Sequence, residues 1–125
     1  YRSDGPRVVV GLPAGASHEL GLLAFATAAR RVGLTTAYVG ADLPTTDWPA
    51  AVTNHAAECA VLSIPRDADL AGVRSVVAAL GVAHPSLTIA VGGSYQDLAP
   101  EVCVRLGHEI GPAAVLLAAT LGARP

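Results

Sequence analysis

Short apolar runs alternate with longer stretches of helical periodicity along the 125-residue chain, and this alternation limits the fold more than any other feature. The runs that predict strands are 7–12, 35–39, 60–64, 87–91 and 108–110. The stretches that predict helices are 17–32, 47–57, 67–83, 98–106 and 113–121. Five strand-helix units in succession indicate a parallel sheet, because right-handed crossovers place helices on both of its faces.

Capping residues and terminal charges agree with the predicted boundaries of the helices. Ser17 is suited to cap the first helix, and Thr46 is predicted to cap the second. Arg30 and Arg31 fall in the last turn of the first helix, where the helix dipole favours cations, and Gly33 follows as a stop signal. The third and fourth predicted strands are uniformly apolar, as strands buried on both faces are. We therefore predict an α/β, flavodoxin-like fold with a five-stranded parallel sheet in the order 2-1-3-4-5.

Composition and charge exclude several classes of partner. The net charge is −2 and the eight basic residues, all Arg, are scattered except for Arg30 and Arg31, so we expect no nucleic-acid contact by this segment. No uncharged apolar run approaches the roughly 18 residues that a membrane span requires, so we expect no membrane partner. Cys59, in a predicted strand, and Cys103, in a predicted helix, are expected to be buried thiols of a cytoplasmic protein.

The ends of the chain favour a domain excised from a longer protein, since it begins at Tyr1 and contains no Met. We expect residues 1–6 to be a linker, residues 7–122 to form the domain and residues 123–125 to be a tail. No nucleophile-base pair, carboxylate dyad or zinc constellation stands out, so this segment is not expected to be an enzyme.

Three predicted strand ends meet at the carboxyl edge of the sheet, where open α/β folds bind ligands. They are the loop 13–18 after the first strand, Ser63 after the third and the Gly92-Gly93 turn after the fourth. His18 in the loop supplies a metal-ligating nitrogen, and Ser63 supplies a hydroxyl. Paired glycines let an extended ligand lie against bare backbone. These residues predict one ligand-binding crevice.

At these residues the sequence resembles the cobalamin-binding domain, whose pattern is Asp-x-His-x-x-Gly, then Ser-x-Leu, then Gly-Gly. His18 and Gly21 match the first element, and Ser63 matches the second. Gly92 and Gly93 match the third. The elements occur in the expected order, and the likeness covers nearly the whole chain.

Three flanking segments, 12–15, 19–24 and 38–44, are similar to the B12-binding domains of MerR-type light-responsive transcriptional regulators. The resemblance implies a cobalamin-binding sensory module of a longer regulator, with helical cap and DNA-binding domains upstream and with homo-oligomer formation left open. It favours adenosylcobalamin and leaves methylcobalamin open. The alternative is a corrinoid carrier domain of a cobalamin-dependent methyltransferase system.

The resemblance also implies how the cofactor is held. In base-off binding the dimethylbenzimidazole tail enters the crevice, and His18 replaces it as the lower axial cobalt ligand. The family pattern assigns Ser63 a hydrogen bond to the tail and gives the tail room beside the glycines. The cofactor-binding residues predicted in this way are Ser17, His18, Gly21, Ser63, Gly92 and Gly93, and the predicted metal ligand is His18.

Two positions depart from the family pattern. Ala16 stands where the family has Asp, so the carboxylate that would accept the second ring N–H of His18 is missing. Such partners are typically worth about 10 to 100-fold in metal affinity, and we therefore expect a weakened cobalt-imidazole bond. Pro65 stands in place of the Leu that follows the family's Ser, which alters the turn after Ser63.

Two other functions of the same topology are disfavoured. A receiver domain needs an Asp at the end of the third strand and a Lys at the end of the fifth, whereas this chain has Ser63 and no Lys. A flavodoxin needs a Ser/Thr-rich phosphate loop after the first strand, and the segment 13–16 lacks one. Three histidines, His55, His84 and His108, belong to no motif and are interpreted as surface or strand-end residues. Trp48 is interpreted as a packing residue.

Overall fold

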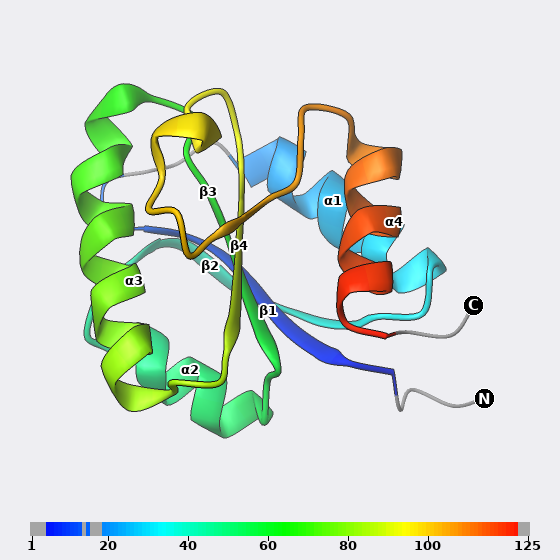
Figure 1. The fold of residues 1–125 in the computed structure, drawn as a ribbon, viewed down its shortest axis with the longest axis horizontal. Helices are drawn as coiled ribbons and strands as arrows, with labels where there is room; N and C mark the ends of the chain where they lie inside the picture. The colour runs from blue at the N-terminus through cyan, green and yellow to red at the C-terminus, as the bar shows by residue number, and fades with distance from the viewer. Residues whose placement is uncertain (1–4, 14, 16–18, 123–125) are drawn as a thin grey trace.

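The five parallel strands form one sheet in the order β2-β1-β3-β4-β5, which confirms the predicted order (Figure 1). The computed structural model describes residues 5–13, 15 and 19–122. The strands are β1 (Arg7–Pro13), β2 (Thr35–Leu43), β3 (Cys59–Ser63), β4 (Thr88–Gly92) and β5 (Val104–Arg105). Because every pair is parallel, the carboxyl ends of the strands share one edge of the sheet.

Helices cover both faces of this sheet, α1 and α4 on one and α2 and α3 on the other (Figure 1). They are α1 (Glu19–Arg31), α2 (Asp47–His55), α3 (Leu70–Ala83) and α4 (Ile110–Thr120), with short 3-10 turns η1 (Asp67–Asp69) and η2 (Gln96–Leu98). As predicted, α1 carries Arg30 and Arg31 in its last turn, and Gly33 follows with a φ of 98°. Within the described residues no helix is both long and apolar enough to cross a membrane.

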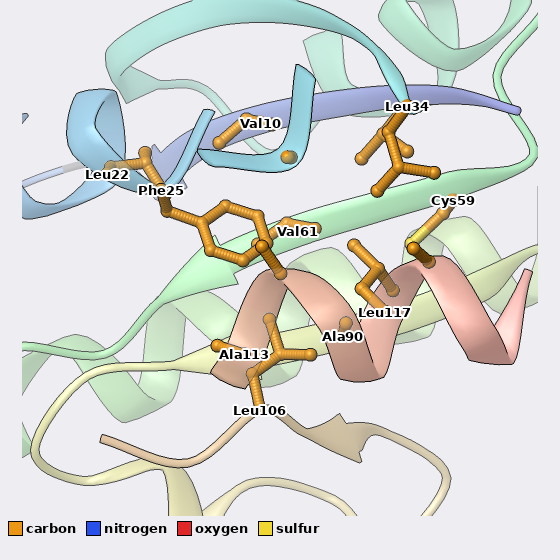
Figure 2. Packing of buried hydrophobic residues seen from close by; sticks show 14 of the residues in the cluster. Val10, Leu22, Phe25, Leu34, Cys59, Val61, Ala90, Leu106, Ala113 and Leu117 are labelled. Carbon is orange, nitrogen blue, oxygen red and sulfur yellow. The ribbon is translucent and has the colours of Figure 1, made fainter. Parts of the chain in front are cut away.

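One hydrophobic core lies between the sheet and the α1–α4 layer. Figure 2 shows the ring of Phe25, from α1, pointing toward Val61 of β3, with Leu117 of α4 in the same cluster. Cys59 is buried in this core and Cys103 in the other one, and both thiols are free, as expected from the sequence. Because the inner strands β1, β3 and β4 are buried on both faces, their side chains are mostly apolar without alternation.

The second core lies between the sheet and the α2–α3 layer and is centred on Trp48. The side chain of Trp48 is fully buried among apolar residues such as Leu62 and Leu80, so its predicted role in packing is confirmed. A Cβ atom added to Gly11 would lie 2.9 Å from the Trp48 ring and 2.8 Å from a methyl group of Val39. The indole therefore requires a glycine at position 11 of β1.

The predicted capping role of Thr46 is wrong. Thr46 precedes α2, but its backbone is helical, with φ −68° and ψ −19°, and its side chain makes no capping hydrogen bond. A capping side chain acts from an extended backbone. The chain instead enters α2 through a turn in which the Asp47 N–H donates to the carbonyl oxygen of Pro44 over 2.9 Å.

The predicted helix over 98–106 does not form. The segment contains the end of η2, then turns, then the two-residue strand β5, and Cys103 lies in a bend rather than in a helix. Pro100 is the physical reason, because proline lacks an N–H and forces the preceding residue out of the helical region. Ala99 accordingly has an extended backbone, with ψ 159°.

The last strand is also displaced from its predicted place at 108–110. It is Val104–Arg105 that pairs with β4, and Gly107 then turns the chain with a φ of 85°. The helix α4 begins at Ile110, before the predicted start at 113, because Pro112 is compatible with a first helical turn. This displacement places residues 107–110 at the carboxyl edge of the sheet.

Candidate functional site

A cavity of about 350 Å³ opens at the carboxyl edge of the sheet, between α1 and α4. Four of the residues predicted from the sequence line it, namely Gly21, Ser63, Gly92 and Gly93. They come from α1, from the end of β3 and from the end of β4. The other two predicted residues, Ser17 and His18, lie outside the described residues, as does Ala16. The structure therefore brings the described part of the predicted constellation into one cavity.

Two of these glycines leave the cavity open. A Cβ atom built on Gly21 or on Gly92 would meet no atom of the described residues within 4 Å, so a side chain there would enter the cavity. Gly93 differs, because its Cβ would lie 2.7 Å from the backbone of Ile64 and its φ is 89°. Gly93 is thus required by the turn after β4, whereas Gly21 and Gly92 are not required by the packing of the described residues.

The floor of the cavity is apolar. Buried side chains line it, namely Leu22, Phe25, Val61, Leu62, Leu106 and Ala113. Several of them stand together on the left of Figure 2, at the end of the first core. Above this floor lies Ser63, whose hydroxyl makes no hydrogen bond to any described residue and is available to a ligand. An apolar cavity with few polar groups is typical of a small-molecule site.

The segment between β5 and α4 forms the far wall, which the sequence analysis did not predict. Gly107, His108, Glu109 and Ile110 line the cavity there. His108 is exposed, as predicted, but it was not assigned to the site, because the displacement of β5 could not be foreseen. Of the other histidines, His55 is exposed at the end of α2, and His84 is half-buried, with its Nε2 atom 3.0 Å from the carbonyl oxygen of Pro49.

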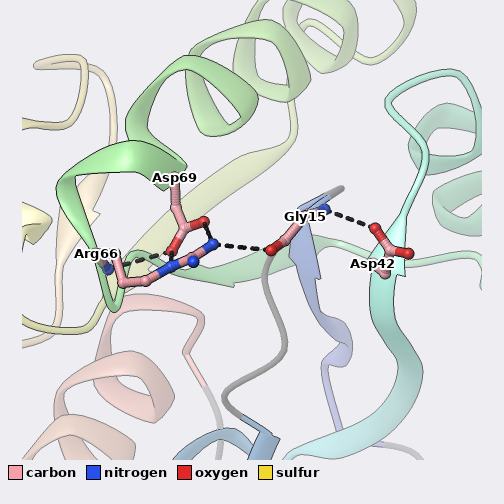
Figure 3. A network of polar contacts seen from close by, with 4 residues as sticks. All are labelled: Gly15, Asp42, Arg66 and Asp69. Atoms are coloured by element: carbon pink, nitrogen blue, oxygen red, sulfur yellow. Dashed lines mark hydrogen bonds and ion pairs between the residues drawn. The ribbon is translucent and has the colours of Figure 1, made fainter.

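The loop after β1 is held at Gly15 from two sides (Figure 3). Its N–H donates to Oδ1 of Asp42 over 2.6 Å, and its carbonyl oxygen accepts from Nη2 of Arg66 over 2.8 Å. Asp69, which is buried, accepts two hydrogen bonds from the Arg66 guanidinium, of 2.7 and 3.1 Å. This hydrogen bonding with Asp69 raises the pKa of Arg66, so the guanidinium stays charged. Asp42 lies in the segment 38–44, which was singled out for its resemblance to B12-binding domains, but neither Asp42 nor Arg66 was predicted to hold this loop.

No cluster of three or more His, Cys, Asp or Glu side chains suited to a metal ion occurs among the described residues. A metal held here would thus need a ligand set of another kind, such as a single side chain below a metal that its own cofactor already coordinates.

Neither a protein-family model nor a curated protein matches the sequence, but solved structures do. A cobalamin-binding protein from Desulfitobacterium hafniense DCB-2 superposes with a TM-score of 0.82 and 20% identity over 91% of this chain and 58% of that one. The methanol:cobalamin methyltransferase complex MtaBC from Methanosarcina barkeri gives 0.85 and 21%, over 97% and 48%. The chain has the flavodoxin-like fold.

The likeness to other proteins of this topology is weaker. The signal receiver domain of the response regulator NarL from Mycobacterium tuberculosis gives a TM-score of 0.61 at 18% identity, although it covers 95% of this chain and 98% of that one. The chain spans less than two thirds of the length of the two cobalamin-related structures. At these identities the likeness establishes the flavodoxin-like fold alone and does not identify a ligand.

Proposed function

We propose that this chain is a cobalamin-binding domain and that its cavity receives the dimethylbenzimidazole tail of a base-off corrinoid. The observation that carries the proposal is the convergence of Gly21, Ser63, Gly92 and Gly93 on one cavity. Its volume of about 350 Å³ lies at the lower end of the roughly 300–1,000 Å³ typical of small-molecule pockets. The cavity suits a planar tail, while the corrin ring would remain outside.

The residues of the cavity fit this tail chemically. The open space beside Gly21 and Gly92 leaves room for a flat heterocycle between α1 and β4. Leu22 and Phe25 offer an apolar surface to its ring, and burying that surface stabilises the complex by about 25 cal/mol per Å². The hydroxyl of Ser63 offers one hydrogen bond at the mouth.

His18 is proposed as the lower axial ligand, on the strength of its place in the motif. When bound, the cobalt supplies an exchangeable upper ligand position, and the imidazole must be neutral to ligate it. Ser17 is proposed to lie against the cofactor beside it. The segment 7–122 is proposed as the binding domain, with residues 1–6 as a linker and residues 123–125 as a tail.

For the role of the whole protein we propose a sensory module of a longer cytoplasmic transcriptional regulator that binds adenosylcobalamin. The similarity of segments 12–15, 19–24 and 38–44 to light-responsive regulators supports this role. The second candidate is a corrinoid carrier that presents methylcobalamin to a methyltransferase, and the structural likeness to the MtaBC complex favours it. In both roles the chain holds the cofactor and catalyses no reaction itself.

Titration calorimetry and absorption spectroscopy with adenosyl-, methyl- and hydroxocobalamin test the binding proposal. We expect heat and a base-off spectral change with at least one of the three. His18→Ala should remove the spectral features of imidazole ligation, whereas His55→Ala, which alters an exposed histidine at the end of α2, should leave them intact. The absence of both heat and spectral change for all three corrinoids would refute the proposal.

The same titrations distinguish the sensory role from the carrier role. A sensor is expected to discriminate strongly in favour of the adenosyl form, since its response depends on that upper ligand. A carrier is expected to bind the methyl and hydroxo forms with similar affinities, because it has to hold its cofactor both with and without the methyl group.

A further inference from the structure

Gln96 is a buried polar residue next to the cavity, only 1% exposed. Its side-chain amide makes three hydrogen bonds. Nε2 donates to the carbonyl oxygens of Gly93 and Gly107, over 2.9 and 3.0 Å, and Oε1 accepts from the N–H of Gly107 over 2.7 Å. Both hydrogen atoms and the oxygen of the amide are therefore used, as buried polar groups require.

The two glycines that Gln96 contacts lie on adjoining walls of the cavity, just beyond the ends of the neighbouring strands β4 and β5. Gly93 follows β4, and Gly107 lies between β5 and α4. Their φ angles, 89° and 85°, belong to the left-handed region, which glycine adopts without strain. Gln96 itself does not line the cavity, so it acts on a ligand only through these two walls.

The backbone alone holds the far wall weakly. The strand β5 has two residues, and its pairing with β4 is Ala90 with Val104 and Val91 with Arg105. The ladder is extended by the Leu106 N–H, which donates to the carbonyl oxygen of Val91 over 3.0 Å. Immediately beyond this point the Gln96 amide takes the place of a peptide group and joins the two strand ends.

We propose that Gln96 is a positioning residue that holds the far wall of the cavity, residues 107–110, in place and thereby sets the affinity for the nucleotide tail of cobalamin. This inference rests on the function proposed above. The amide holds Gly107 beside Gly93, since one nitrogen atom binds both carbonyl oxygens. A tail in the cavity then meets a far wall that is already in place and does not have to order the segment at Gly107 itself.

Gln96→Met tests this role with a side chain of similar length and no amide. The substitution removes the partner of the Gly107 carbonyl oxygen and N–H, while the Gly93 carbonyl oxygen keeps its 3.3 Å hydrogen bond from the Gln96 backbone N–H, so the far wall is free to move. We expect cobalamin affinity to fall by about tenfold or more, whereas cobinamide, which lacks the nucleotide tail, should bind as it does to the wild type. Gln96→Asn keeps the amide on a shorter side chain and should give a smaller loss.

The experiment is calorimetry of both variants with hydroxocobalamin and with diaquocobinamide, alongside Asp97→Asn as the matched control. Asp97 is the next residue, and its side chain is 81% exposed. Its ion pair with Arg105 of β5 is long, at 4.0 Å, and such an exposed pair contributes little, so the substitution should change neither affinity. Exchange of the Gly107 amide in ligand-free protein gives an independent readout and should be faster in Gln96→Met. If Gln96→Met does not fold, Gln96→Asn supplies both measurements.

The ratio of the affinities for hydroxocobalamin and diaquocobinamide tests the positioning role of Gln96. A ratio of cobalamin to cobinamide affinity that collapses in the Gln96 variants supports the positioning role. A ratio equal to that of the wild type, or an equal loss for both corrinoids, overturns it, because a general loss of stability does not select the tail. A wild-type protein that binds neither corrinoid contradicts the proposed function itself, which is a separate result.

Discussion

Arg66 donates a hydrogen bond of 2.8 Å from Nη2 to the carbonyl oxygen of Gly15, 51 positions earlier in the sequence. The Gly15 N–H is bonded at the same time to Asp42, at the end of β2 (Figure 3). The loop after β1 is thus tied to the ends of both strands that flank β1 in the sheet. Because His18 follows Gly15 by three residues, the chain leaves for the proposed ligand from a point that Asp42 and Arg66 hold, and neither residue was among the predicted site residues.

Asp42→Gly should loosen this attachment. Its backbone has a φ of 59°, which glycine adopts freely, so the substitution removes the carboxylate without adding strain. The Gly15 amide should exchange about fivefold faster, the effect of losing a hydrogen bond worth ~1 kcal/mol. Asp42→Asn keeps an acceptor oxygen and should retain slow exchange. Equal exchange rates in the two variants, measured by NMR, would contradict this prediction.

Gly21→Ala should stabilise the ligand-free protein and weaken cobalamin binding. Alanine in a helix is favoured over glycine by about 0.5–1 kcal/mol, and the new methyl group meets no atom of the described residues within 4 Å. The same methyl group would occupy the cavity. Gly81→Ala in α3 is the matched control, since that methyl group also meets nothing, and it should raise the free energy of unfolding without affecting binding. Denaturant unfolding should show the gain in the free energy of unfolding, and calorimetry should show the loss of cobalamin affinity.

Gly92→Ala and Gly93→Ala should separate binding from folding. At Gly92 the added methyl group has open space, so we expect weaker cobalamin binding with an unchanged free energy of unfolding. At Gly93 the φ of 89° and the 2.7 Å approach to the Ile64 backbone should lower the free energy of unfolding by about 1–3 kcal/mol. Gly40→Ala, with a φ of 106° and no nearby atom, measures the strain alone.

Ala16→Asp should tighten cobalt ligation. A carboxylate at position 16 restores the family's partner for the second ring N–H of His18, which orients the imidazole and raises its basicity. The expected gain in cobalamin affinity is up to roughly 100-fold, accompanied by a stronger imidazole-bound absorption spectrum. In a His18→Ala background the Asp should bring no gain. A gain that persists without His18 would show that the carboxylate acts on something else.

Cys59 makes the stability of the protein depend on alkaline pH. Burial, and to a lesser extent the charge of Glu58, raises the pKa of its thiol from 9.0 to about 12. The unfolded chain loses this proton first, so the contribution is complete below about pH 9 and is lost as the pH rises toward about 12, by ~1.4 kcal/mol per pH unit. Unfolding of Cys59→Ala should show a shallower fall over this range. At neutral pH Cys59 should resist thiolate-directed reagents.

The sequence predicted the first four strands well because they are apolar and separated by clear helical periods. The order 2-1-3-4-5 and the meeting of Ser63 with the Gly92-Gly93 turn were predicted from that pattern, whereas Gly21 was predicted from the resemblance to cobalamin-binding domains. The far wall of the cavity could not be predicted, because a strand of only two residues leaves no periodic signal. Pro100 was the available signal against the helix predicted over 98–106.

The polar contacts that hold the site were missed for a different reason. Gln96, Arg66 and Asp42 act on backbone atoms of residues distant in the sequence, and no local pattern marks such a role. Their partners become visible only when the strand ends are brought together. A search for polar residues just beyond predicted strand ends would have found Asp42 and Arg66, but not the atoms that they bind.

The apolar floor of the cavity is also the open end of the first core, since Leu22, Phe25, Leu106 and Ala113 belong to both. A ring seated on that floor would act as one more core side chain, supplied from solution rather than by the chain. Ligand concentration and folding would then be linked by mass action, with a gain of about 2.7 kcal/mol at a hundredfold excess over Kd. In a cell poor in the cofactor this protein would be less stable, and its abundance would report the supply of its ligand.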